Sequence, residues 1–347
     1  MSIFDLVKAP ELTSYWEEHI QDQPPYLGEE LFPADKKLGL NLDWIKGANG
    51  LPVVLKPSAF DVGAVPRPRI GFDKLHTQMP FFKESMYIDE ELRQELNMVL
   101  ETSNQAYIDA VMRRVFDDEM HLLEGARARR EEMRMMALTT GAISVAANGQ
   151  AYDYDYGVPA THKVTTNASW ADTVNSDPIE DMRKWMDLVE NDTGVRPVRG
   201  ALTRKTWGYL RNNQKIIKNL FVLSNGQVSA VSDQRLTQYL SDELGLELVL
   251  YGKRYVNDSG VTTQFVPDDM VVLFPAGDLG KTWFGTTPEE SDLMGGKVAN
   301  VSITDMGVAV TTIEKADPVN VETKVTMICL PSFEQANNIV IADVVIP

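Results

Sequence analysis

The stretch GKRYVNDSGVTTQFVPDDMVVLFPAGDLGKTWFG, residues 252–285, can form either a nucleotide site or a series of strands and turns, and the two alternatives imply different folds. The tetrapeptide NDSG at 257–260 is a turn signal, and β-branched and aromatic residues flank it. MVVLF at 270–274 is a short apolar run. Residues 246–274 are therefore predicted to form three strands with a turn at NDSG.

The end of this stretch, FPAGDLGKTWFG at 274–285, contains the Gly-Lys-Thr of a phosphate-binding loop. A Walker A loop needs a glycine five residues before Gly280, and Pro275 occupies that position. Proline has no N–H to offer a phosphate. The loop must also open a helix, but Gly285 and Pro288 follow at once. The sequence predicts a connection after a strand rather than a nucleotide site.

The composition indicates a globular protein. The 347 residues are 44% apolar and 24% charged, enough for two ordinary domains or one large domain. The net charge of −17 repels phosphates, which argues against sequence-specific binding of nucleic acid. The single cysteine, Cys329, allows no intrachain disulfide, fits a reducing compartment and is expected in a buried strand. We find neither the pattern of a secretion signal nor an apolar run of membrane-spanning length.

A long helix is predicted from about residue 104 to 140. No proline occurs between Phe81 and Val158, and Gly141 can end the helix. At 1.5 Å per residue it would be roughly 55 Å long. Its alternating acidic and basic residues are typical of a solvated or interfacial face. Its apolar stripe comprises Tyr107, Val111, Val115, Leu122, Ala126, Met133 and Met136.

The rest of the chain alternates short helices and strands. Residues 148–170 are predicted to form two short strands, and residues 307–345 are rich in strands. Helix signals occur at 178–193, where Pro178 follows a Ser/Asp cap and Gly194 ends the pattern, at 203–220 as two short helices, and at 233–244. The fold class is therefore α+β, and the long helix and the β tail could close one layer with the middle of the chain inserted between them.

Residues 51–80 are predicted to form a long, irregular hairpin, because prolines forbid a continuous central strand. Its charge is opposite to that of the whole chain, with Lys56, Arg67, Arg69 and Lys74 against Asp61 and Asp73. A basic arm on an acidic protein suggests contact with an acidic surface, and a second copy of the same chain would provide one.

No catalytic constellation is found. Asp153 and Asp155 would share a strand face but lack the further oxygen donors of a calcium loop. The four histidines show no zinc-ligand spacing, and no G-x-S-x-G elbow is present. We therefore expect no enzyme, no cofactor and no metal. Four tryptophans are expected to be core or interface anchors: Trp170, Trp185, Trp207 and Trp283.

Residues 252–285 resemble the late-middle segment of the lambda-like capsid protein E family. The shared features are a strand, a turn, a Phe-x-Pro-Asp step and a glycine loop. These are major capsid proteins of tailed bacteriophages with the HK97-type fold. The tail AVTTIEKADPVNVETKVTMICLPSFEQANNIVIADVV, residues 309–345, is similar to the C-terminus of that family. The order of elements matches across nearly the whole chain.

The resemblance implies a division of the chain and a set of contacts. Lys56, Arg67, Arg69, Lys74 and Lys281 become candidate assembly-interface residues. The implied parts are an N-terminal arm (1–50), an extended β-hairpin loop (51–85), a first part of the peripheral domain with the spine helix (86–172), a mixed α/β axial domain (173–297), and a second, β part of the peripheral domain (298–347).

The resemblance also implies partners. The chain would form hexamers and pentamers of an icosahedral head, assembled in the bacterial host cytoplasm and ending in the virion. It would meet a portal protein, a decoration protein and packaged double-stranded DNA without sequence-specific binding, and would have no membrane partner. Some relatives carry a scaffolding segment before the arm; this chain shows none, which implies a separate scaffolding protein.

Three other interpretations remain open at this point. An encapsulin-like compartment shell shares the fold and would carry cargo instead of DNA. A phage tail or adaptor component would form tubes or rings. An enzyme of unknown class would be a monomer or small oligomer with a deep pocket.

Overall fold

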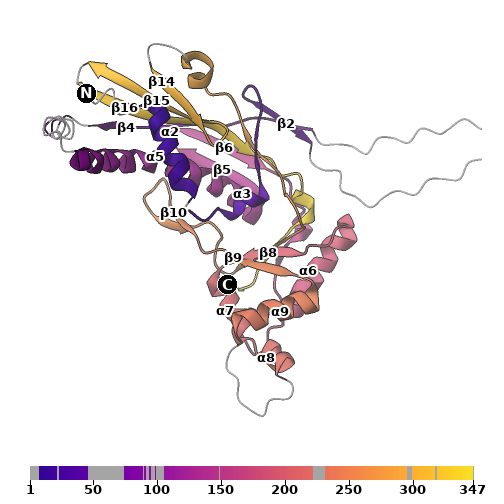
Figure 1. Cartoon of the computed structure of the whole chain (residues 1–347). Coiled ribbons are helices and arrows are strands. Elements are labelled where there is room, and N and C mark those ends of the chain that lie inside the picture. The colour runs from indigo at the N-terminus through magenta and orange to yellow at the C-terminus, as the bar shows by residue number, and fades with distance from the viewer. Residues whose placement is uncertain are drawn as a thin grey trace, which may run out of the picture. The chain divides into compact units, whose positions relative to one another are not determined.

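The computed structural model contains two compact units (Figure 1). The first comprises residues 1–43, 76–133 and 281–332, and the second comprises residues 44–75, 134–280 and 333–347. The structure describes residues 8–21, 23–45, 74–88, 90, 94, 98, 105–147, 149–221, 231–294, 299–316 and 319–346.

The predicted long helix is confirmed as α5, Gln105–Thr140. Gly141 ends it with a φ of +75°, and its N–H donates to the carbonyl of Ala137. A Cβ at this position would lie 2.6 Å from Cγ2 of Val158, so only glycine fits both the backbone and the space. Of the predicted apolar stripe, Val115, Leu122, Ala126 and Met133 are buried and Met136 is half-buried.

Of the two readings of the alternating charges, a solvated or an interfacial face, the solvated one is wrong for part of this helix. Glu119, Arg127, Arg130 and Glu131 are all buried. Other segments of the first unit cover this part of the helix and supply hydrogen-bond partners for its charges.

The first unit is built on a six-stranded sheet. Its strands follow the order β1-β13-β16-β15-β14, and β4 also pairs with β16. All these pairs are antiparallel except β1 with β13. The strands are β1 (Ala34–Lys36), β4 (Phe81–Ile88), β13 (Thr282–Phe284), β14 (Asn300–Thr304), β15 (Val308–Ala316) and β16 (Val319–Pro331).

Different segments cover the two faces of this sheet. Ser302, Val310 and Val325 lie opposite one another across three strands and so share one face with Thr323. On that face Ser302 contacts α2 (Ala9–Gln21) and Thr323 contacts α5. On the opposite face Thr326 donates to Glu289 at the start of the π-helical turn η2 (Glu289–Leu293). The β16 strand is therefore buried on both sides.

Two strands outside this sheet flank most of the segment in which the hairpin is predicted. They are β2 (Asn41–Ile45) and β3 (Lys74–Gln78), which pair with each other. Residues 46–73, which contain most of the predicted arm, lie outside the described residues.

The second unit contains a five-stranded mixed sheet in the order β7-β17-β12-β8-β9. Helices pack on one of its faces, where Val271, Leu273, Val340 and Ala342 join a core with Trp185. The strands are β7 (Lys163–Thr165), β8 (Arg199–Leu202), β9 (Glu247–Leu250), β12 (Met270–Phe274) and β17 (Val340–Asp343); the helices are α6 (Pro178–Thr193), α7 (Arg204–Asn212), α8 (Gln214–Leu220) and α9 (Asp233–Leu244). The four helix predictions are confirmed.

Two hairpins complete this unit. One joins β5 (Ala142–Ala147) to β6 (Gln150–Asp155), and the other joins β10 (Arg254–Val256) to β11 (Thr262–Gln264) through the predicted NDSG turn. Three short elements remain, α3 (Leu27–Leu31) in the first unit and the single turns η1 (Ala160–His162) and η3 (Ala336–Asn338) in the second.

The strand count predicted for residues 246–274 is wrong, because the structure has four strands there rather than three. The β10–β11 hairpin pairs only with itself, whereas β9 and β12 belong to the five-stranded sheet. A further strand, β13, follows the glycine loop and pairs with β16. One division between the units falls after Gly280. The predicted domain boundary after residue 297 stays a prediction.

Candidate assembly surfaces

The N-terminal segment is fastened to the long helix by a buried arginine. The guanidinium of Arg127 donates to both carboxylate oxygens of Glu29, with 2.8 Å from Nε to Oε1 and 2.9 Å from Nη2 to Oε2. It also donates to Oε1 of Gln23 over 3.0 Å and stacks 4.6 Å from the ring centre of Tyr26. The Arg127 side chain is only 5% exposed. Such a planar, bidentate contact fixes position as well as charge.

Two neighbouring charges of α5 add to this attachment. Oε1 of Glu131 accepts a hydrogen bond from the backbone N–H of Gly28 at the start of α3, over 3.0 Å. Arg130 donates to Asp305 over 2.6 Å. Asp305 lies in the turn between β14 and β15 with a φ of +47°, a conformation that costs energy for a residue with a side chain. The buried charges of α5 thus hold both the N-terminal segment and a sheet turn.

Lys281, a predicted interface residue, is engaged within its own chain. Its Nζ lies 2.6 Å from Oδ2 of Asp35 and 5.3 Å from the ring centre of Trp283. The hydrogen bond from Lys281 is the main reason why the pKa of Asp35 is lowered. Trp283 in turn donates from its indole N–H to Oγ of Ser332 over 3.1 Å. Both charged groups remain partly exposed, so a neighbouring chain could reach them.

The other predicted interface residues are not brought together by the described structure. Lys56, Arg67 and Arg69 lie outside the described residues, and Lys74 begins β3 with its side chain outside them as well. Their role as assembly contacts stays a prediction.

A second buried ion pair lies on the face of the six-stranded sheet that η2 covers. Nζ of Lys324 on β16 lies 2.7 Å from Oε1 of Glu289, and the two side chains are 10% and 6% exposed. Burial alone would raise the pKa of Glu289, but the hydrogen bonds from Lys324 and Thr326 outweigh it and lower this pKa. The carboxylate is therefore held ionised at neutral pH.

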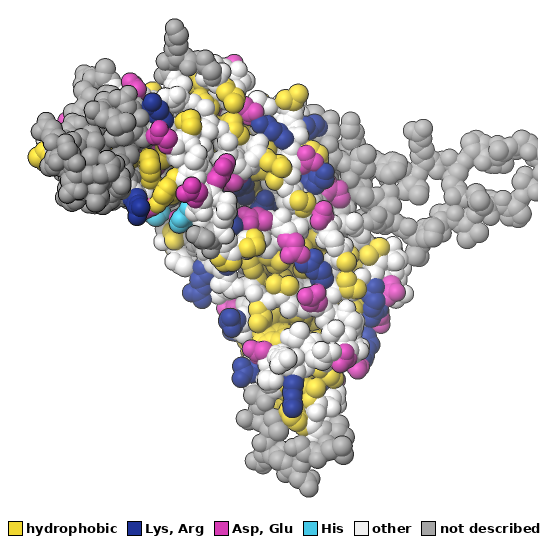
Figure 2. All heavy atoms as spheres, viewed as in Figure 1, with side chains coloured by type: hydrophobic (Ala, Val, Ile, Leu, Met, Phe, Trp, Pro, Cys, Tyr) yellow, Lys and Arg dark blue, Asp and Glu magenta, His cyan; other side chains and the backbone are white. Residues whose placement is uncertain are grey.

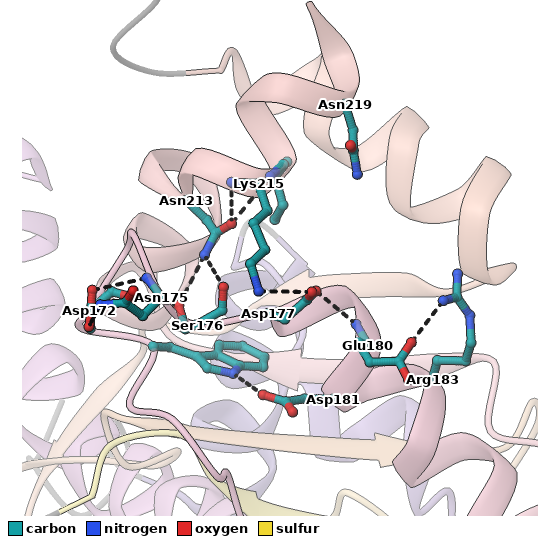
Figure 3. A network of polar contacts seen from close by, with 12 residues as sticks. Asp172, Asn175, Ser176, Asp177, Glu180, Asp181, Arg183, Asn213, Lys215 and Asn219 are labelled. Carbon is teal, nitrogen blue, oxygen red and sulfur yellow. Dashed lines mark hydrogen bonds and ion pairs between the residues drawn. The ribbon is translucent and has the colours of Figure 1, made fainter. Parts of the chain in front are cut away.

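In the second unit, polar side chains position the helices (Figure 3). Asp177 caps α6 and pairs with Lys215 over 3.1 Å, while Asn213 caps α8 and donates to Oγ of Ser176. Figure 3 also shows Asp181 below this group, where its Oδ2 accepts from the indole N–H of Trp170 over 3.0 Å. These contacts fix the relative positions of α6 and α8. We therefore assign these polar side chains a structural role.

The acidic pair of β6 and the histidines form no catalytic or metal-binding group in the described residues. Asp153 and Asp155 are exposed on β6, and Asp153 accepts a hydrogen bond from Ser144. His162 is buried, with Nε2 3.2 Å from Oδ2 of Asp192. Among the described residues, no three His, Cys, Asp or Glu side chains gather as a metal site would require. No helix in the part of the chain that the structure describes is long and apolar enough to cross a membrane.

The predicted aromatic and thiol core residues are confirmed. Trp170, Trp185 and Trp207 are buried in the second unit, and Trp283 is half-buried. Cys329 is fully buried on β16.

Sequence reasoning missed Arg127, Arg130 and Glu131. Their spacing of three and four residues places them on one helix face, which the sequence does show. The sequence does not show that residues 23–29, more than 90 positions earlier, cover Arg127 and Glu131, or that Asp305 pairs with Arg130.

Comparisons with known proteins agree on one family. Residues 8–344 match the family described as phage major capsid protein E. A search of curated proteins gives no match.

Two solved structures are similar over nearly their whole length. A protein described as the prophage capsid protein of Escherichia coli CFT073 shares 17% identity, with 97% of this chain and 99% of that chain covered and a TM-score of 0.62. A phage-related protein from Bordetella bronchiseptica RB50 shares 15% identity, with 98% of each chain covered and a TM-score of 0.59. These likenesses show a shared fold, the HK97-like fold of phage capsid proteins. With 337 residues matched to one family model, the chain belongs to the phage major capsid protein E family.

Proposed function

We propose that this structural capsid subunit assembles, as hexamers and pentamers, into an icosahedral phage head that encloses double-stranded DNA. The observation that carries the proposal is the family match over residues 8–344. A closed shell needs one subunit to repeat a small set of interfaces. Its function then lies in contacts between copies rather than in a reaction, and the chain is not an enzyme.

The predicted hairpin supports contacts between copies. The strand β2, which ends at Ile45, pairs with β3, which begins at Lys74. The 28 residues between them, 46–73, join the two strands. Lys56, Arg67 and Arg69 lie in this segment, and the chain as a whole carries a net charge of −17. A neighbouring copy therefore offers carboxylates for these cations.

The remaining partners follow from the family resemblance. We place a separate scaffolding protein, a portal protein and a decoration protein beside the shell, which assembles in the host cytoplasm and becomes part of the virion. The strongly acidic composition suits a container for DNA, because like charge limits non-specific sticking.

Sedimentation and negative-stain microscopy of the purified chain test this proposal. The chain should be studied alone and after co-expression with scaffold-like gene products from the same genome. Closed particles that enclose DNA in the infected cell support a head. Particles filled with a protein cargo indicate a compartment shell, and open tubes or rings indicate a tail or adaptor component; either result contradicts the proposal.

A further inference from the structure

The charges of this chain are unevenly distributed. Residues 201–232 contain five basic residues and no Asp or Glu. This segment contributes +5 to the formal net charge of −17, so the remaining residues carry −22. The five basic residues are Arg204, Lys205, Arg211, Lys215 and Lys218, and they all lie on α7 and α8.

Only part of this charge is neutralised within the chain. Lys205 pairs with Asp269 over 2.6 Å and Lys215 with Asp177 over 3.1 Å. Arg211 reaches Asp233 only at 3.8 Å. Arg204 and Lys218 are exposed and have no carboxylate partner among the described residues. By contrast, Arg183 and Arg196 on the same unit each pair with two carboxylates.

A cation of α9 extends the same surface. The guanidinium of Arg235 lies 5.4 Å from the ring centre of Phe221, which follows α8, and Arg235 is exposed. The amide of Asn219 donates to the hydroxyl of Tyr239 over 3.1 Å, so α8 and α9 lie side by side. We call the exposed cations of these three helices, Arg204, Arg211, Lys218 and Arg235, the basic surface. Figure 2 shows Lys and Arg side chains in dark blue among Asp and Glu side chains in magenta over the visible face of the chain.

The positions of two of these cations oppose local helix stability. Arg204 is the first residue of α7 and Arg235 is the third residue of α9. The N-terminal end of a helix carries partial positive charge, which disfavours cations in the first turn. Arg204 gains no ion pair with another described residue in return, and Arg235 gains only its contact with the Phe221 ring. Departures from local rules are expected at functional positions.

We infer that this basic surface docks against an acidic surface of a second copy of the chain. The inference rests on the proposed function, since it names one of the contacts through which copies assemble. The partner follows from charge: outside residues 201–232 the chain carries −22, so a neighbouring copy offers carboxylates to Arg204, Lys218 and Arg235. Two different surfaces meet in such a contact, which is the arrangement that generates rings and larger assemblies.

A charge-reversed variant of the full chain, Arg204→Glu with Lys218→Glu and Arg235→Glu, tests the inference. The matched control, Arg204→Lys with Lys218→Arg and Arg235→Lys, keeps the charge and changes only the shape. Self-association of both variants and of the wild type is measured by sedimentation and light scattering over a range of NaCl concentrations. Unfolding is followed by circular dichroism at concentrations below self-association.

We expect the reversed variant to raise the concentration needed for self-association roughly tenfold or more, as for loss of close charge pairs at an interface. The control should stay within about threefold of the wild type, and added salt should weaken the wild type and the control but not the reversed variant. The reversed variant should remain folded, because the new carboxylates at positions 204 and 235 suit the helix N-termini and offset the one at position 218, which lies in the last turn of α8.

Unchanged self-association of the reversed variant overturns the inference and leaves the proposed function intact. So does a reversed variant that assembles normally but binds double-stranded DNA more weakly, which would identify a polyanion as the partner. A wild type that stays monomeric under all conditions contradicts both the inference and the proposed function.

Discussion

Arg127 in α5 and Glu29 in α3 form a two-point ion pair although 98 positions separate them. The arginine is buried and the glutamate is 30% exposed, so the pair joins a covered helix face to a surface segment. Because the same guanidinium also holds Gln23 and Tyr26, one side chain fixes most of the turn that leads from α2 into α3.

Replacing this arginine should loosen the N-terminal segment. Arg127→Gln leaves Glu29 without its cation and is expected to lower the free energy of unfolding by about 2 kcal/mol. Urea unfolding monitored by circular dichroism measures the change. Arg113→Gln, on an exposed position of the same helix, should change stability by less than about 0.5 kcal/mol. Equal effects of the two variants would show that the ion pair does not fasten the segment.

The Glu289–Lys324 pair predicts a dependence of stability on pH. The pKa of Glu289 is lowered in the folded chain, so its contribution is present above the pKa of the unfolded chain and is lost as pH falls through the folded value. Melting temperatures of the wild type and Glu289→Gln, compared from pH 7 down to pH 3, check this. The difference between them should shrink with acidification; a constant difference would contradict the ionised pair.

Two glycines of the second unit should respond oppositely to alanine. A Cβ at Gly200, on β8, would lie 2.7 Å from Cδ2 of Leu248 and 2.9 Å from the carbonyl of Val272. Gly200→Ala should therefore cost about 1–3 kcal/mol. Gly208 lies inside α7, where an added methyl group would have nothing within 4 Å, so Gly208→Ala should add about 0.5–1 kcal/mol. Thermal unfolding of both variants measures the change in the free energy of unfolding. A Gly200→Ala protein as stable as the wild type would contradict the packing described for β8.

The local elements could largely be predicted from the sequence. The helix α6 illustrates why: Asp177, Pro178 and Gly194 act within one turn of the helix ends, so the signals and the structure are neighbours in the chain. The long helix α5 was predictable for the same reason, as its length depends on the absence of proline and its end on Gly141.

Long-range pairing could not be predicted in the same way. The strand β13 has only three residues, and it forms because Thr282–Phe284 lie between β1 and β16, which the sequence does not place beside it. The buried charges of α5 were misjudged for a related reason. The sequence around Arg127 is typical of a solvated helix face. No local pattern indicates that residues 23–29 bury this side chain.

Reversing the charge of the hairpin should separate assembly from folding. Arg67→Glu with Arg69→Glu is expected to block shell assembly, because a basic segment that meets an acidic neighbour becomes repulsive. The monomer should remain folded by circular dichroism. Electron micrographs of the variant provide the measurement, and full-size particles would contradict a role for these arginines.

Cryo-electron microscopy of the assembled wild-type chain would show whether it forms a shell. We expect closed shells with icosahedral symmetry, in which every subunit has the fold of α5 packed on the β14–β15–β16 sheet and meets its neighbours through repeated contacts. A chain that remains a monomer, or that forms only open tubes or a small closed oligomer under every assembly condition, would contradict it.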